Sequence, residues 1–458
     1  QRAKDRAEAL AIEDPVERAA RLRELDLQDQ EAALEKRAEQ ERAALEARKA
    51  QRVADLLGDL VLGGDPMFEK GLDAPVGELL DRSAERIQDE LDDEPEVQAT
   101  LLQDLGIVYR NVGAYDRSRP LLERALELRR SVLEPGDPAV AQTLFHLGWL
   151  EKEVGRADSA EVLYRESLDL FRRAGRDTSV AVTANNLAIL LQNEGRLEEA
   201  RPLYEEALAI RRRVLEPDDP QIATSLNSLG FLAHHLGRYD EAERYYREAV
   251  EMARRVSPDF RLAAALNNLA GLQLDRGNAQ EAAAGYREVL QLLLERFDDD
   301  NQYVIMTRTA LAGCLGMQGE LDEARALADT ALAAALRAFP EGHNIVDQAR
   351  VTLAGIQERR GDLASAESGF RKALASYERT RPDHYMTART RWRLGKVLLH
   401  EGRLDEAEPL LLSARRQLQR TNPEREDDLE AMAASIEELD EAKGRPEAAA
   451  ELGSAGGG

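Results

Sequence analysis

Apolar positions along most of the chain repeat with a period of 40 to 42 residues, and a glycine marks each period. A leucine lies eight residues before each of these glycines, and the residue after the leucine is Gly or Ala. A small residue, usually Ala, lies five residues after each glycine. The glycines are Gly113, Gly155, Gly195, Gly237, Gly277, Gly319, Gly361 and Gly402. The pattern predicts two helices per period, A and B, joined at a glycine that adopts a left-handed backbone conformation.

Residues at the helix ends agree with this division. Helix B opens with acidic residues such as Asp240 and closes with arginines such as Arg254, which is the arrangement that the helix dipole favours. Between periods, Asp137-Pro138 and Asp219-Pro220 predict an N-cap followed by proline in the first turn of helix A. One such pair of helices cannot bury its own apolar stripe, so the periods are expected to stack into an all-α solenoid.

The pattern of leucine, turn glycine, alanine and, in five periods, tyrosine or phenylalanine resembles the tetratricopeptide repeat. The longer period and the sequences LEPDDPQIATSLNSLG (215–230) and ALNNLA (265–270) are similar to the kinesin-light-chain type of this repeat. The resemblance covers about residues 98–421. It implies an all-α solenoid of eight helix-turn-helix repeats that form a right-handed superhelix, with the A helices lining a concave groove.

The segments outside the repeats have other compositions. Residues 1–62 predict a long charged helix, either a solvated linker or a self-association segment. Residues 63–97 predict N-terminal capping helices, and residues 422–458 a C-terminal capping helix with a flexible tail. This order of segments also resembles the extracytoplasmic part of bacterial membrane-anchored serine/threonine kinases with tetratricopeptide tails, which implies a sensing or docking role. Gln1 in place of Met indicates a processed chain or a piece of a longer one.

Composition narrows the classes of partner. Aromatic residues make up 5% and charged residues 33%, with a net charge of -25. An acidic chain of this kind is not expected to bind nucleic acid or an anionic membrane surface, since both require a basic face. No apolar stretch approaches the length needed to insert into a bilayer. The kinase resemblance implies an extracytoplasmic or secreted bacterial protein; a cytoplasmic location remains the alternative.

No sequence motif indicates catalysis. The chain has no phosphate-binding loop, no kinase signature and no Cys/His spacing typical of zinc, so no catalytic residue, cofactor or metal is expected. The single cysteine, Cys314, lies among apolar residues of a helix A and is expected to be a buried structural thiol. His234 and His235 are adjacent on a helix and point about 100° apart, so they cannot chelate one metal as a pair.

Polar and aromatic residues recur where the A helices are expected to line the groove. Asn185, Asn227 and Asn267 occupy the same repeat position, and Asn186 and Asn268 follow directly. The kinesin-light-chain resemblance implies that such amides bind the backbone of an extended peptide; alternatively they bind the neighbouring repeat's own helices. Trp149, Phe231 and His234 occupy related positions, the aromatic residues as apolar anchors or as packing residues.

The sequence therefore predicts a non-enzymatic scaffold that binds a protein or peptide in the groove. Two alternatives stay open. A solenoid has two open ends, so the chain could self-assemble into an oligomer or filament through contacts that do not close. The chain could also be the sensor or docking region of a bacterial membrane-anchored kinase.

Overall fold

The computed structural model describes residues 76–256, 260–423 and 425–445, together with the short stretches 10–11, 15, 21–25, 27–28, 30 and 36–37. Apart from those stretches, the long helix predicted over 1–62 lies outside the described residues. So do residues 63–75 and the tail predicted after residue 445. The domain boundaries at residues 98 and 421 stay predictions.

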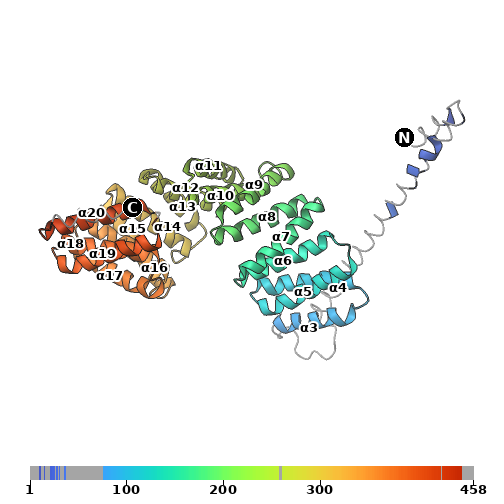
Figure 1. Ribbon diagram of the computed structural model, residues 1–458, viewed down its shortest axis with the longest axis horizontal. Coiled ribbons are helices and arrows are strands. Elements are labelled where there is room, and N and C mark those ends of the chain that lie inside the picture. The colour runs from blue at the N-terminus through green and yellow to red at the C-terminus, as the bar shows by residue number, and fades with distance from the viewer. Residues whose placement is uncertain are drawn as a thin grey trace. The chain divides into compact units, whose positions relative to one another are not determined.

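The chain forms two compact units, Gln1–Leu190 and Leu191–Gly458. The helices of the first unit are α3 (Val76–Glu90), α4 (Pro95–Asn111), α5 (Tyr115–Val132), α6 (Pro138–Glu153), α7 (Ala157–Arg173) and most of α8 (Asp177–Asn193). Those of the second are α9 (Leu197–Val214), α10 (Pro220–His235), α11 (Tyr239–Val256), α12 (Phe260–Asp275), α13 (Ala279–Leu294), α14 (Gln302–Gln318), α15 (Leu321–Ala338), α16 (Asn344–Arg359), α17 (Leu363–Thr380), α18 (Tyr385–His400), α19 (Leu404–Thr421) and α20 (Glu426–Ala442) (Figure 1).

From α4 to α19 the helices alternate as A and B members of successive helix-turn-helix repeats, and the even-numbered ones are the A helices. The predicted left-handed conformation is confirmed at every turn glycine of the period, with φ of +79° at Gly113 and +85° at Gly319. The predicted N-caps are also confirmed. Asp137 accepts a hydrogen bond of 2.8 Å from the Ala139 amide, and Asp219 accepts one of 2.8 Å from the Gln221 amide.

The A and B helices of a repeat approach closely at the residue that follows the repeated leucine. In the pair α10–α11, a Cβ placed on Gly230 would lie 2.6 Å from Cδ1 of Tyr246, whose side chain is fully buried. A Cβ placed on Gly148 in α6 would lie 2.9 Å from Cδ1 of Tyr164 in α7. Glycine is therefore required at these two positions because a tyrosine ring occupies the space of its missing side chain.

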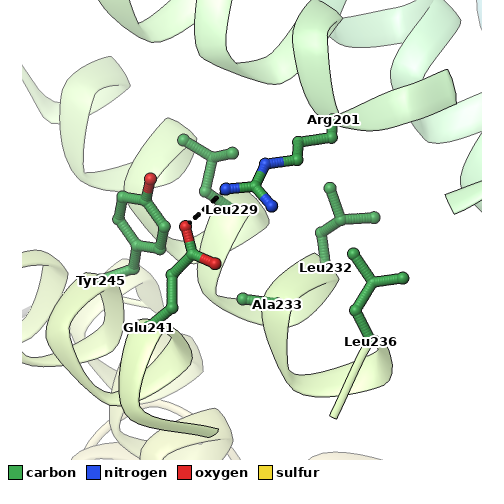
Figure 2. Close-up of a pocket in the computed structure, with 7 residues that line it drawn as sticks. All are labelled: Arg201, Leu229, Leu232, Ala233, Leu236, Glu241 and Tyr245. Atoms are coloured by element: carbon green, nitrogen blue, oxygen red, sulfur yellow. Dashed lines mark hydrogen bonds and ion pairs between the residues drawn. The ribbon is translucent and has the colours of Figure 1, made fainter. Parts of the chain in front are cut away.

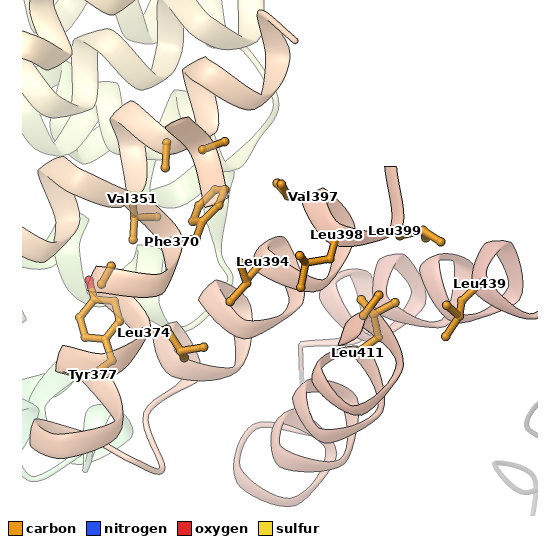
Figure 3. Packing of buried hydrophobic residues seen from close by; sticks show 14 of the residues in the cluster. Val351, Phe370, Leu374, Tyr377, Leu394, Val397, Leu398, Leu399, Leu411 and Leu439 are labelled. Atoms are coloured by element: carbon orange, nitrogen blue, oxygen red, sulfur yellow. The ribbon is translucent and has the colours of Figure 1, made fainter. Parts of the chain in front are cut away.

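Apolar packing continues from one repeat to the next. In the second unit, one cluster joins Val351 of α16, Phe370 of α17, Leu394 of α18 and Leu411 of α19 with Leu439 of α20 (Figure 3). Helix α20 has no B partner within the described residues, and its exposed side is acidic. Helix α20 packs on the last repeat through this cluster, and the assignment of residues 422–458 as a C-terminal cap stays a prediction.

Helix α3 covers the other end of the described repeats. Its Ile87 is buried against α4, and the Tyr109 hydroxyl of α4 donates a 2.6 Å hydrogen bond to Asp81. Burial and this contact raise the pKa of Tyr109 to about 12. The amphipathic pattern of this segment is thus explained by its packing on the first repeat.

Arginines replace apolar residues early in the later A helices, and each of the two buried ones has an acidic partner. Arg308 Nη2 lies 2.6 Å from Asp299, and Arg350 Nη1 lies 3.1 Å from the buried Asp347. Asp347 also accepts a 2.5 Å hydrogen bond from Ser376 in α17. Each pair gives a buried guanidinium an opposite charge, without which burying the arginine would be strongly unfavourable.

Candidate peptide-binding surface on the A helices

The first unit holds three of the predicted site residues, Trp149 on α6 and Asn185 and Asn186 on α8. The Asn186 amide donates to the Val182 carbonyl of its own helix at 2.9 Å. The side-chain oxygen of Asn185 is buried and has no hydrogen-bond partner among the described residues. Neither side chain forms a hydrogen bond with another asparagine among the described residues of this unit.

Trp149 is half-buried beneath a cation. The Arg110 guanidinium of α4 lies 3.7 Å from the centre of the Trp149 ring, and the indole N–H donates to Glu153 at 3.1 Å. Arg110 Nη1 also lies 3.3 Å from Nδ1 of His146. Burial, followed by the charges of Arg110 and Arg129, lowers the pKa of His146 to about 4. The histidine is therefore neutral at pH 7 and can accept a hydrogen bond from Arg110.

The second unit brings two predicted asparagines together. Asn268 on α12 donates a 3.0 Å hydrogen bond from Nδ2 to Oδ1 of Asn227 on α10. Asn267, one residue earlier, is exposed and makes no side-chain hydrogen bond with a described residue. The amides thus join neighbouring A helices and also leave hydrogen-bonding groups toward solvent.

The other two predicted residues of this unit lie on α10. Phe231 is half-buried, and the ring of His235 stacks on it with the ring centres 4.0 Å apart. His234 Nε2 lies 2.9 Å from Asp275 Oδ2 at the end of α12. His234 therefore links two A helices.

Four exposed apolar residues on α12 and α14 were not predicted as site residues. Phe260, Tyr303, Met306 and Met317 are 49%, 42%, 47% and 46% exposed. The rings of Phe260 and Tyr303 meet edge to face with centres 5.6 Å apart. The signal is present in the sequence, because Tyr303, Met306 and Met317 lie at helical spacing on one face.

A small pocket lies between α9, α10 and α11 (Figure 2). An ion pair of 2.8 Å between Arg201 and Glu241 spans it, and its remaining wall consists of the Tyr245 side chain and apolar residues of α10. The only carboxylate that lines this pocket, Glu241, is occupied by its ion pair with Arg201, and we interpret the pocket as a gap in the packing of the helices. Among the described residues no group of three His, Cys, Asp or Glu side chains could hold a metal ion.

The family model of the tetratricopeptide repeat matches residues 78–173, 179–255, 261–337 and 346–420, which together are more than half of the chain. The chain belongs to the tetratricopeptide repeat family. The resemblance in the sequence is thereby confirmed. Proteins of this family are generally non-catalytic scaffolds, and the repeat fold implies protein partners. None of the helices in the described ranges is long and apolar enough to cross a membrane.

Solved structures of tetratricopeptide repeat proteins are similar in fold, and kinesin-light-chain-like proteins are among them. BtubC (BKLC) from P. vanneervenii is 22% identical over 49% of this chain and 90% of its own, with a TM-score of 0.42. A kinesin-light-chain-type protein from Podosopora anserina with nearly identical TPR-like repeats is 20% identical over 43% of this chain and 95% of its own, with a TM-score of 0.39.

The structural likeness is greater for a signal transduction ATPase with numerous domains from Pyrococcus horikoshii, which carries a tetratricopeptide repeat sensor. It is 15% identical, with a TM-score of 0.53 over 66% of this chain and 44% of its own length. At this identity the match shows the fold alone. No curated protein sequence matches this chain significantly.

Proposed function

We propose that the chain is a non-catalytic scaffold that binds an extended segment of a partner protein on the A helices of its second unit. The observation that carries this proposal is the hydrogen bond between Asn268 and Asn227 beside the exposed Asn267. This bond uses one N–H of Asn268 and one lone pair of Asn227, so both amides retain further donors and acceptors. An extended peptide backbone presents alternating donors and acceptors that three such amides can bind.

The charge distribution over the helices supports the same surface. The sequences of α10, α12 and α14 contain only three Asp, Glu, Lys or Arg residues, namely Arg261, Asp275 and Arg308, and Arg308 is buried. The B helix α11 alone contains more charged residues than these three A helices together. A surface with so few charges suits backbone hydrogen bonds and apolar side chains, because neither kind of contact requires an ion to lose water.

The remaining predicted residues have supporting roles in the proposal. Phe231 offers an apolar contact on α10, and His234 holds α10 to α12 through Asp275. In the first unit, Trp149 beneath Arg110 offers a second apolar surface, with Asn185 and Asn186 on α8.

The proposal is tested by selecting peptides from a random display library on the purified chain and measuring the affinity of the selected peptide by fluorescence anisotropy. The triple variant Asn227→Ala, Asn267→Ala, Asn268→Ala should bind at least about tenfold more weakly, since each lost hydrogen bond is worth about 1 kcal/mol. The matched control is Gln291→Ala, an exposed amide on the B helix α13. Unchanged affinity in the triple variant, with helicity intact, would contradict the proposal.

Self-assembly and a role beside a kinase stay predictions. The segment 1–62, which is the candidate for self-association, lies outside the described residues apart from short stretches. Measuring the mass of the chain over a wide range of concentrations distinguishes the first alternative, because a filament-forming chain gains mass with concentration. The full sequence encoded by the gene tests the second alternative, because a kinase region would be encoded together with this chain.

A further inference from the structure

One face of helix α14 carries no charged residue, and this uncharged stripe is exposed toward its two ends and partly buried at Ala310 and Gly313 in its middle. Tyr303, Met306, Ala310, Gly313 and Met317 follow one another at spacings of three, four, three and four residues, so they share one face. Tyr303, Met306 and Met317 are each more than 40% exposed. Two of the six methionines of the chain therefore lie on a single exposed stripe, which is a composition typical of adaptable binding surfaces.

Few atoms of other helices lie near the middle of the stripe, at Gly313, whereas large side chains lie toward both of its ends. A Cβ placed on Gly313 would find only Thr352 Cγ2, at 3.9 Å, among its non-local neighbours. Tyr303 and its neighbour Phe260 on α12 form a raised edge at one end, and Met306 and Met317 lie on either side of the glycine. A large aliphatic side chain from another molecule fits over Gly313 between the two methionines.

Acidic residues lie at both ends of the stripe. Three aspartates, Asp298 to Asp300, precede α14. Asp299 pairs with Arg308 and Asp300 with Arg337, and exposed Asp298 forms no ion pair with a described residue. After the stripe, half-exposed Glu320 has only a distant contact, 3.8 Å from an arginine of α13. With a net charge of -25 for the chain, these ends attract positive charge on a partner.

We propose that this stripe binds the apolar side of a basic amphipathic helix in a partner protein. The proposal rests on the scaffold function above and adds a second surface, on α14, which binds a helical segment instead of an extended one. The apolar side chains of the partner helix lie along Tyr303, Met306 and Met317, with one of them over Gly313. Its lysines or arginines lie toward Asp298 and Glu320.

The probes are two labelled synthetic peptides of about 18 residues, long enough for about five helical turns. One has leucines on one face and lysines on the other; the second has glutamates in place of the lysines. A third peptide has the composition of the first with the leucines dispersed, and it measures purely ionic attraction to the acidic chain. Affinities are measured by fluorescence anisotropy with the wild-type chain and with variants.

The test variant is Met306→Glu with Met317→Glu, and the matched control is Leu294→Glu with Leu336→Glu, which adds the same charge at equally exposed apolar residues of the B helices. The added glutamates attract the lysine peptide, so a loss of affinity must come from the lost apolar contact. We expect at least about tenfold weaker binding of the leucine–lysine peptide in the test variant and no loss in the control.

Equal affinity in the test and control variants overturns this inference, as does equally tight binding of the glutamate peptide or of the dispersed peptide. The asparagine triple variant separates the two proposals. One outcome is that the triple variant weakens binding of the library-selected peptide while the methionine variant leaves binding of the leucine–lysine peptide unchanged. That result would support the scaffold function and contradict the helix-binding stripe. If the methionine variant alone loses binding, the asparagine site falls instead.

Discussion

Arg129 near the end of α5 donates a hydrogen bond of 2.6 Å to the hydroxyl of Thr143 in α6, and so joins helix B of one repeat to helix A of the next. The same guanidinium donates to the side chain of Gln103 at 2.6 Å and to the Ala139 carbonyl at 2.9 Å. Both Arg129 and Thr143 are buried. In the second unit, Arg211 makes the equivalent contact with Ser225.

Replacing Arg129 with Met should lower the free energy of unfolding by about 2 kcal/mol or more, because buried acceptors lose their donor. The measurement is a urea titration followed by circular dichroism. The control is Arg130→Met, which removes an exposed ion pair with Glu166 and should change stability by less than about 0.5 kcal/mol. Equal effects of the two substitutions would show that the buried contact is not stabilising.

Replacing Gly230 with Ala should destabilise the second unit by about 1–3 kcal/mol, because the added methyl group collides with the buried ring of Tyr246. At Gly271 the nearest atom is the Tyr286 hydroxyl, 3.6 Å from the added Cβ. Gly271→Ala should therefore raise stability by about 0.5–1 kcal/mol through helix propensity alone. Thermal unfolding of both variants measures the two effects. A loss of stability in both variants would contradict the prediction that the methyl group collides with a ring only at Gly230.

His146 should make the first unit sensitive to acid. Its folded pKa of about 4 lies below the ordinary histidine value of 6.5, so the unfolded chain binds the proton more readily. The stabilising contribution of neutral His146 is fully present above about pH 6.5 and is lost as the pH falls toward 4, by up to about 3 kcal/mol.

The measurement is thermal unfolding between pH 7 and 4 for the wild-type chain and for His146→Asn. The variant should lose less stability than the wild type over this interval, whatever its stability at pH 7. The same loss of stability between pH 7 and 4 in the His146 variant and the wild type would contradict the prediction.

Cys314 should resist thiol reagents in the folded protein. Its side chain is fully buried, and burial raises the pKa of the thiol to about 11, so little thiolate forms near neutral pH. An aromatic disulfide reagent should react only in denaturant, at the rate of a free thiol. Fast reaction of the native chain, comparable to that of glutathione, would show that α14 opens readily.

Much of the fold could be read from the sequence because a repeat displays its packing rules many times. The turn glycines, the aspartate caps such as Asp137, the terminal helix with Met432 and Ile436, and the burial of Cys314 all follow from local spacing or from apolar surroundings in the chain. The A-helix positions of the asparagines also follow from the period. Each of these features depends on residues within about one repeat of each other.

The contacts between repeats required the tertiary structure. Spacing aligned Asn227 with Asn267, yet the hydrogen bond joins Asn227 to Asn268, because the stacking of the two helices sets which amides meet. The position of Arg110 over Trp149 likewise joins residues of different repeats. The sequence by itself determined the repeat, its helices and the face on which partners are expected. The stacking of the helices decided which side chains pair with a neighbour and which, like Met306, stay exposed, because a side chain is covered only by what packs against it.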